Sequence, residues 1–251
     1  QEAGYYTIAP SRGMKYYIST FSNASTPNIV TVHRGDGAKV ETLVDSRKAV
    51  AELGKRPAKE FFTFTTERGD TLNAYMVRPL DFDPSKRYPV LLTQYSGPGS
   101  QSVADRWGVD WEDAVVPHGY IVVCTDGRGT GYRGEAFKKA TYGRLGALEV
   151  EDQISLAKYM SRQKYVDAYR IGIYGWSYGG FMALNCALHG EGLFRMAIAV
   201  APVTSWRYYD TIYTEIYNGL PQDNTKGYDD NSPLSHAEKL AERTQLLIIH
   251  G

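Results

Sequence analysis

The stretch IYGWSYGGFM, residues 173–182, joins an apolar run to a group of small residues around one serine, Ser177. It fits the pattern Gly-x-Ser-x-Gly as Gly175, Trp176, Ser177, Tyr178 and Gly179. A strand expected over residues 170–174 and a helix expected over 178–188 place this pattern at a nucleophile elbow, where larger residues beside the serine would clash with nearby backbone. The alternative is a glycine-rich turn with an incidental serine. Because strand, turn and helix occur in the required order, we expect Ser177 to be a nucleophile.

Apolar strands alternate with helix-length segments on both sides of the elbow. We expect a hairpin over residues 61–66 and 71–78, strands over 88–94, 120–125, 170–174, 196–200 and 245–249, and helices over 103–117, 144–162, 178–188, 205–217 and 237–242. Nearly continuous apolar strands that alternate with helices indicate a parallel sheet covered on both faces. A hairpin followed by parallel strands, with the elbow after the third of them, is the order of the α/β-hydrolase fold.

The N-terminal part has a different pattern. Residues 5–46 consist of short strands and tight turns, which predicts one four-stranded sheet of the kind found in a β-propeller blade. A single blade cannot bury both of its faces, so we expect neighbouring blades elsewhere in a longer protein. Residues 48–59 resemble a linker. The expected domains are residues 1–57, the end of an N-terminal β-propeller with its linker, and residues 58–251, an incomplete α/β-hydrolase domain.

Composition narrows the classes of function. The 28 Lys and Arg residues balance the 28 Asp and Glu residues, so nothing indicates binding to nucleic acid. The longest apolar runs are far shorter than the roughly 20 residues that span a bilayer. The two cysteines, Cys124 and Cys186, have neither metal-site nor disulfide spacing, and we expect them to be buried. We expect no metal and no cofactor.

A rival reading comes from GTGYRG, residues 129–134, which matches the dinucleotide-binding pattern Gly-x-Gly-x-x-Gly. Glu149 lies about 20 residues further on, where such a fold places its ribose-binding carboxylate. However, these glycines should open a helix directly and lie early in the fold, whereas here a polar loop intervenes. A nucleotide-binding oxidoreductase is therefore the weaker hypothesis.

Hydrolysis by Ser177 would also require donors for an oxyanion. The backbone N–H of Tyr178 is one donor by position, and the second should come from the loop after the third strand, QYSGPGSQ, residues 94–101. In that loop the phenol of Tyr95 can donate a hydrogen bond. Its position alone is equally consistent with a packed aromatic ring.

Several further motifs carry a family resemblance. QYSGPGSQ, DGRGTGYRG, RLGALEVEDQ, GWSYGG, AVAPVTSWRYYDTIYTEIY and LLIIHG occur in that order between residues 94 and 251. Together they closely resemble the dipeptidyl peptidase IV branch of the prolyl oligopeptidase family. The resemblance covers nearly all of residues 60–251, and the first part of the chain looks like the end of that family's propeller.

The resemblance implies an exopeptidase that releases an N-terminal dipeptide whose second residue is proline or, less well, alanine. Ser177 would be the acylated nucleophile, and Tyr95 with the N–H of Tyr178 would form the oxyanion hole. The proline pocket would be lined by Tyr178, Val203, Trp206, Tyr209 and Tyr213. Independently, Trp206, Tyr209 and Tyr213 fall on one face of the helix expected over 205–217, although an ordinary core stripe has the same spacing.

The chain also departs from the family pattern. The family's triad acid and histidine would follow the HG at residues 250–251. The histidines present are expected to be surface or packing residues: His33, His118, His189, His236 and His250. We therefore expect the 251 residues to be a fragment that is inactive alone. A prolyl tripeptidyl peptidase and an acyl esterase of the same fold stay open as alternatives. The resemblance further suggests a periplasmic, cell-surface or secreted protein and is compatible with a homodimer.

Overall fold

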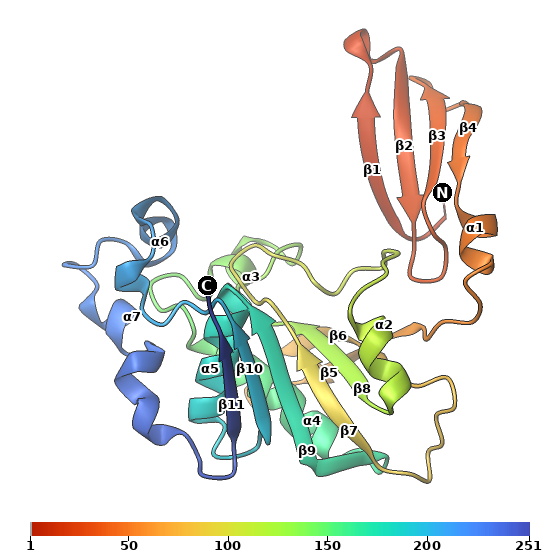
Figure 1. Ribbon diagram of the computed structural model, residues 1–251. Coiled ribbons are helices and arrows are strands. Elements are labelled where there is room, and N and C mark those ends of the chain that lie inside the picture. The colour runs from red at the N-terminus through yellow and green to blue at the C-terminus, as the bar shows by residue number, and fades with distance from the viewer. Residues whose placement is uncertain (1) are drawn as a thin grey trace.

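The computed structural model describes residues 2–251, which form two units joined by a short connection (Figure 1). The first unit is an antiparallel sheet in the order β1-β2-β3-β4. Its strands are β1 (Tyr5–Pro10), β2 (Tyr16–Ser22), β3 (Ile29–Arg34) and β4 (Lys39–Asp45), with the 3₁₀ turn η1 (Arg12–Met14) after β1. Apolar side chains are exposed on this sheet, among them Ile8, Val40 and Leu43.

The connection between the units is partly helical, which corrects the expectation of a linker over residues 48–59. Helix α1 (Arg47–Ala51) follows β4 directly, and only residues 52–58 lack regular structure before β5 begins. The expected boundary between residues 57 and 58 nevertheless falls one residue before the first strand of the second sheet.

The second unit is built on a mixed seven-stranded sheet in the order β11-β10-β9-β7-β8-β6-β5. Its strands are β5 (Lys59–Thr65), β6 (Thr71–Val77), β7 (Tyr88–Thr93), β8 (Ile121–Asp126), β9 (Val166–Trp176), β10 (Met196–Val200) and β11 (Gln245–Ile249). Strands β5 and β6 form the predicted hairpin, and β7 to β11 run parallel. The elbow follows β9, the third parallel strand. The predicted α/β architecture is therefore confirmed, with the strand order expected of an α/β-hydrolase.

The central strands are buried on both faces. Along β8, Ile121 and Val123 pack into a large core with α4 (Leu148–Ser161) and α5 (Tyr178–His189), whereas Val122 and Cys124 face the opposite side. Alternate residues of a strand point to opposite faces, so a strand covered on both faces has a continuous apolar run, here residues 121–124. Both cysteines are buried, as expected, and neither forms a disulfide. Within residues 2–251, no helix has the length and apolarity required to cross a bilayer.

Three predicted helices differ from those observed. The remaining helical segments are α2 (Glu112–Val115), η2 (Val116–His118), α3 (Glu135–Lys139), η3 (Trp206–Tyr208), α6 (Thr211–Asn218), α7 (Thr225–Asp229) and η4 (Pro233–Lys239). The helix expected over 237–242 is thus an earlier 3₁₀ segment. Residues 205–217 contain two short helices because two side chains cap separate starts: Ser205 accepts from Arg207 N, and Asp210 accepts from Tyr213 N.

The first half of the helix expected over 103–117 is a loop, because its polar groups bond elsewhere. The carboxylate of Asp126 accepts from the N–H of Ser102 at 2.9 Å and from that of Val103 at 2.7 Å. Further along, the Asp105 carboxylate accepts from Ala24 N at 2.7 Å, in the loop between β2 and β3. Tertiary contacts therefore override the local helical pattern.

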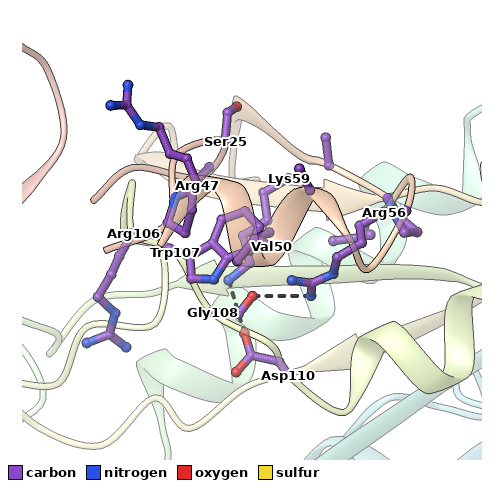
Figure 2. A pocket seen from close by; sticks show the side chains of 16 residues that line it. Ser25, Arg47, Val50, Arg56, Lys59, Arg106, Trp107, Gly108 and Asp110 are labelled. Atoms are coloured by element: carbon purple, nitrogen blue, oxygen red, sulfur yellow. Dashed lines mark hydrogen bonds and ion pairs between the residues drawn. The ribbon is translucent and has the colours of Figure 1, made fainter. Parts of the chain in front are cut away.

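The same loop lines a cavity of about 400 Å³ between the two units (Figure 2). The guanidinium of Arg56 lies 4.9 Å from the centre of the Trp107 ring and donates to the Gly108 carbonyl at 3.4 Å. Lys59 forms an ion pair with Asp110 at 3.3 Å. Arg56 therefore attaches the connection to the α/β unit, whereas the pair of Lys59 and Asp110 lies within that unit. None of the predicted site residues lines this cavity.

Candidate active site

Ser177 occupies a strained turn between β9 and α5. Its backbone dihedrals are φ 58° and ψ −115°, outside the regions that non-glycine residues favour. The turn is held from both sides, because the Ser177 N–H donates to the Val200 carbonyl at 2.9 Å and its carbonyl accepts from Phe181 N at 3.0 Å. This geometry is that of a nucleophile elbow, with the serine half-buried at the end of the strand.

The glycines on either side of the serine are required sterically, as predicted. A Cβ on Gly175 would overlap the backbone carbonyl of Gly179. A Cβ on Gly179 would lie 2.5 Å from the carbonyl oxygen of Gln94, in the loop after β7. Both neighbours are backbone atoms that cannot move aside. The tight turn therefore requires glycine at 175, and the close approach of the loop after β7 requires glycine at 179.

A buried polar network fastens the loop after β7 to the elbow, and sequence reasoning missed it. The Gln94 amide donates to the Gly179 carbonyl at 2.8 Å and accepts from the Ser96 hydroxyl at 3.0 Å. Ser96 in turn accepts from the Gln153 amide of α4 at 3.1 Å. The available signal was a run of polar residues immediately after an apolar strand.

Tyr95 lies within this loop and reaches the elbow. Its ring centre is 6.0 Å from that of Tyr178, and 38% of the residue is exposed. Partial burial raises the pKa of the Tyr95 phenol, so the hydroxyl stays protonated and can donate at neutral pH. The structure therefore brings Tyr95 beside the residue that follows the nucleophile.

The side chain of Tyr178 points into the protein. It is only 1% exposed, and its ring contacts Phe181 and Trp206 at centroid distances of 5.4 and 5.3 Å. Its hydroxyl donates to the carboxylate of Glu149 at 2.7 Å. Burial raises the pKa of Glu149 to about 7, against the lowering effect of its hydrogen bonds. Sequence reasoning did not find this role for Glu149.

The same contact removes the basis for a dinucleotide site. The Glu149 carboxylate is directed at Tyr178 and at the N–H of Gly146, 3.1 Å away, and not at the glycines of residues 129–134. Those glycines lead into α3, a helix of only five residues. The geometry of a ribose carboxylate opposite a glycine-opened helix is not present here.

The predicted pocket residues gather, although not on one helix. Trp206 is buried in η3 and stacks on Tyr213 of α6 at 6.0 Å. Tyr209, 44% exposed between the two helices, meets Trp206 edge-on at 5.9 Å and Tyr213 at 5.5 Å. Val203 is half-buried against the core. The expected single helical face is wrong, because the caps described above divide it, yet the aromatic rings form one cluster that contacts Tyr178 through Trp206.

The contacts of the histidines in residues 2–251 are with residues other than Ser177. His33 stacks on Tyr17, and His189 contacts His236. His250 is exposed after β11, with its Nδ1 2.7 Å from the carbonyl oxygen of Gly251. Among residues 2–251, no histidine is hydrogen-bonded to Ser177, and no group of three His, Cys, Asp or Glu side chains is arranged to hold a metal ion.

Comparisons with known proteins agree with this geometry. The sequence pattern of the prolyl oligopeptidase family matches residues 107–251. A probable dipeptidyl-aminopeptidase B of Sclerotinia sclerotiorum is 40% identical in an alignment of 253 positions, which covers 99% of this chain and 27% of that protein. The probable dipeptidyl-aminopeptidase B of Aspergillus fumigatus is 41% identical in an alignment of 254 positions, which also covers 99% of this chain and 27% of that protein. The chain thus spans about a quarter of the length of these relatives.

Solved structures are similar over the full length of the chain. The crystal structure of Porphyromonas gingivalis dipeptidyl peptidase 4 superposes with a TM-score of 0.96 at 45% identity, covering 100% of this chain and 36% of that one. A putative dipeptidyl aminopeptidase IV from Bacteroides ovatus gives a TM-score of 0.91 at 30% identity, covering 99% and 36%. Both units of the structure, and their arrangement, are therefore similar to those of known proteins.

Proposed function

Because the chain belongs to the prolyl oligopeptidase family, we propose that the full-length protein containing it is a serine exopeptidase that releases N-terminal X-Pro or X-Ala dipeptides through an acyl-enzyme on Ser177. The observation that carries this proposal is the position of the aromatic cluster, which begins at Tyr178, the residue directly after the strained nucleophile. A proline ring is compact and apolar, and aromatic walls enclose it well while excluding long or charged side chains.

In this proposal the Ser177 oxygen attacks the carbonyl carbon of the substrate's second residue. The C–N bond then breaks, the amine leaves with the proton that a base took from Ser177, and water hydrolyses the resulting ester. The oxyanion would be stabilised by the N–H of Tyr178 and the phenol of Tyr95. Tyr178 opens α5, where backbone N–H groups lack acceptors within the helix and the helix dipole favours negative charge.

The base and the acid of the triad are proposed to lie outside these 251 residues. None of the histidines in the described part approaches Ser177 by a hydrogen bond, and the matched relatives are several times longer. Loss of the base from a serine protease lowers kcat by about 10⁶. Residues 1–251 alone should therefore be inactive as a peptidase.

The domain assignment is likewise a proposal. We assign residues 1–57 to the end of a β-propeller and its connection, and residues 58–251 to the peptidase domain. Support comes from the four-stranded antiparallel order of the first sheet and from its exposed apolar side chains, which need neighbouring surfaces.

The proposal is tested on the full-length protein with a fluorophosphonate and chromogenic amides. We expect the label on Ser177 and turnover of Gly-Pro and Ala-Pro amides that disappears in Ser177→Ala. Labelling at another residue would refute the assignment of the nucleophile. Faster turnover of short acyl esters than of prolyl amides would favour the esterase alternative, and cleavage after the third residue of Ala-Ala-Pro amides would favour a tripeptidyl peptidase.

A further inference from the structure

The carboxylate of Glu149 is buried without a cationic partner. Glu149 is 1% exposed, and its carboxylate accepts hydrogen bonds from the Tyr178 hydroxyl and the Gly146 N–H, while its own backbone N–H also stabilises the ionised form. The other titratable groups that influence it are the Asp152 carboxylate one turn along α4 and the Tyr213 phenol of α6. Asp152, by contrast, is paired with Arg128 at 2.6 Å. A buried carboxylate without a cation is costly, which indicates a role beyond packing.

The Tyr178 ring is held at both ends. Its backbone belongs to the elbow, and its hydroxyl is fixed 2.7 Å from Glu149. Between these points the ring lies 6.0 Å from the ring of Tyr95 and 5.3 Å from that of Trp206, centre to centre. A shift of the hydroxyl end would therefore move the ring relative to both the proposed oxyanion donor and the wall formed by Trp206.

The hydrogen bond from the Gly146 N–H connects Glu149 to a second wall of the pocket, the one formed by Tyr213 of α6. Gly146 belongs to a loop that bonds to α6 and the residues after it. Gly143 N donates to the Tyr217 carbonyl at 2.7 Å, and the Asn224 amide donates to the Gly143 carbonyl at 2.9 Å. Tyr213, one turn before Tyr217, stacks on Trp206. Glu149 is thus hydrogen-bonded both to Tyr178, one wall of the pocket, and to the loop that holds α6, which carries another.

We propose that Glu149 is a positioning residue that acts through the Tyr178 hydroxyl to set the width of the aromatic pocket, and so determines the preference for proline over alanine at the substrate's second residue. This inference rests on the proposed function. Above its pKa of about 7 Glu149 is ionised, and the bond from Tyr178 is then charge-assisted, which makes it shorter and more directional than a neutral hydrogen bond. A wall fixed in this way would contact a proline ring closely and an alanine methyl group hardly at all.

The test compares the kcat/KM of Gly-Pro and Gly-Ala p-nitroanilides in the full-length enzyme. Glu149→Gln keeps the shape but removes the charge, and Tyr178→Phe keeps the ring but removes the donor. In both variants we expect the Gly-Pro to Gly-Ala ratio to fall on the order of tenfold, mainly through a higher KM for Gly-Pro. The double variant should show no further fall. Glu151→Gln, a partly exposed position of the same helix that pairs with Arg68 rather than with the pocket residues, is the matched control and should keep the ratio.

The outcomes separate the two proposals. Titration of active sites with a fluorophosphonate corrects for misfolded protein, since a purely structural role lowers the active fraction and leaves the ratio unchanged. If Glu149→Gln does not fold, Tyr178→Phe decides by the same ratio. If the wild-type enzyme cleaves both amides and the Gly-Pro to Gly-Ala ratio of each variant stays within twofold of the wild-type ratio, this inference is wrong and the proposed function stands. A wild-type enzyme that cleaves neither amide overturns the proposed function, and this inference with it.

Discussion

Replacement of Glu149 by glutamine should change how stability depends on pH. In the folded protein burial raises the pKa of Glu149 from its ordinary value of 4.5 to about 7. The folded state therefore binds this proton more tightly than the unfolded chain does. The stability that Glu149 contributes by this binding is fully present below pH 4.5 and is lost as the pH rises through about 7. Glutamine does not titrate, so its contribution is independent of pH.

The two pKa values set the size of the effect. Each pKa unit between the folded and the unfolded state corresponds to about 1.4 kcal/mol. The stability that the wild type loses between pH 4.5 and 8 is therefore roughly 3 kcal/mol. Asp126 and Asp152, whose pKa values are also raised by burial, are present in both proteins and largely cancel in the comparison. Between pH 4.5 and 8 the variant should thus gain roughly 3 kcal/mol relative to the wild type.

Thermal unfolding of the two full-length proteins at half-unit pH intervals measures this difference. About 2 to 4 °C of Tm corresponds to each kcal/mol for a domain of this size. We expect the Tm of Glu149→Gln relative to the wild type to rise by several degrees between pH 4.5 and 8. If the plots of Tm against pH for the two proteins are parallel from pH 4.5 to 8, Glu149 does not titrate in this range, and the inference that burial raises its pKa is wrong.

Three other substitutions test separate parts of the structure. Tyr95→Phe keeps the ring but removes the proposed oxyanion donor, so kcat on Gly-Pro amides should fall by about 10² to 10³ with KM little changed; an unaltered kcat would leave Tyr95 a packing residue. Gly179→Ala places a Cβ 2.5 Å from the Gln94 carbonyl, which should destabilise the domain by about 1 to 3 kcal/mol and reduce fluorophosphonate labelling, whereas normal labelling would contradict the close approach. Arg128→Met leaves the buried Asp152 carboxylate unpaired, which should lower the free energy of unfolding by about 3 to 5 kcal/mol in denaturant titrations; a loss below about 1 kcal/mol would mean that Asp152 is neutral in the fold.

The features that could be predicted from the sequence were those determined by short, continuous segments of the chain. Apolar runs identified the parallel strands, and the glycines around Ser177 identified the elbow, because each depends on neighbouring residues alone. The helices over 103–117 and 205–217 were wrong because capping side chains and contacts with the first sheet outweighed the local pattern.

The interior of the site could not be predicted in the same way. The hydrogen bond between Tyr178 and Glu149 joins residues 29 positions apart, and the one between Gln94 and Gly179 joins residues 85 apart. Buried polar pairs of this kind leave no periodic pattern, since each residue alone could equally be exposed. Their partners become evident only once the strands are in place.

The pairing of β7 with β9 has a consequence for the newborn chain. β7 lies between β8 and β9 in the sheet, but β9 begins at Val166, some 40 residues after the end of β8 at Asp126. At a synthesis rate of about 5 to 20 residues per second, ribosomes need roughly 2 to 8 s to supply that partner. Through this interval one edge of an apolar strand stays open to other chains. Crowded polysomes should therefore be the place where this protein is most prone to aggregate, and holdase chaperones should bind it most strongly before β9 has emerged.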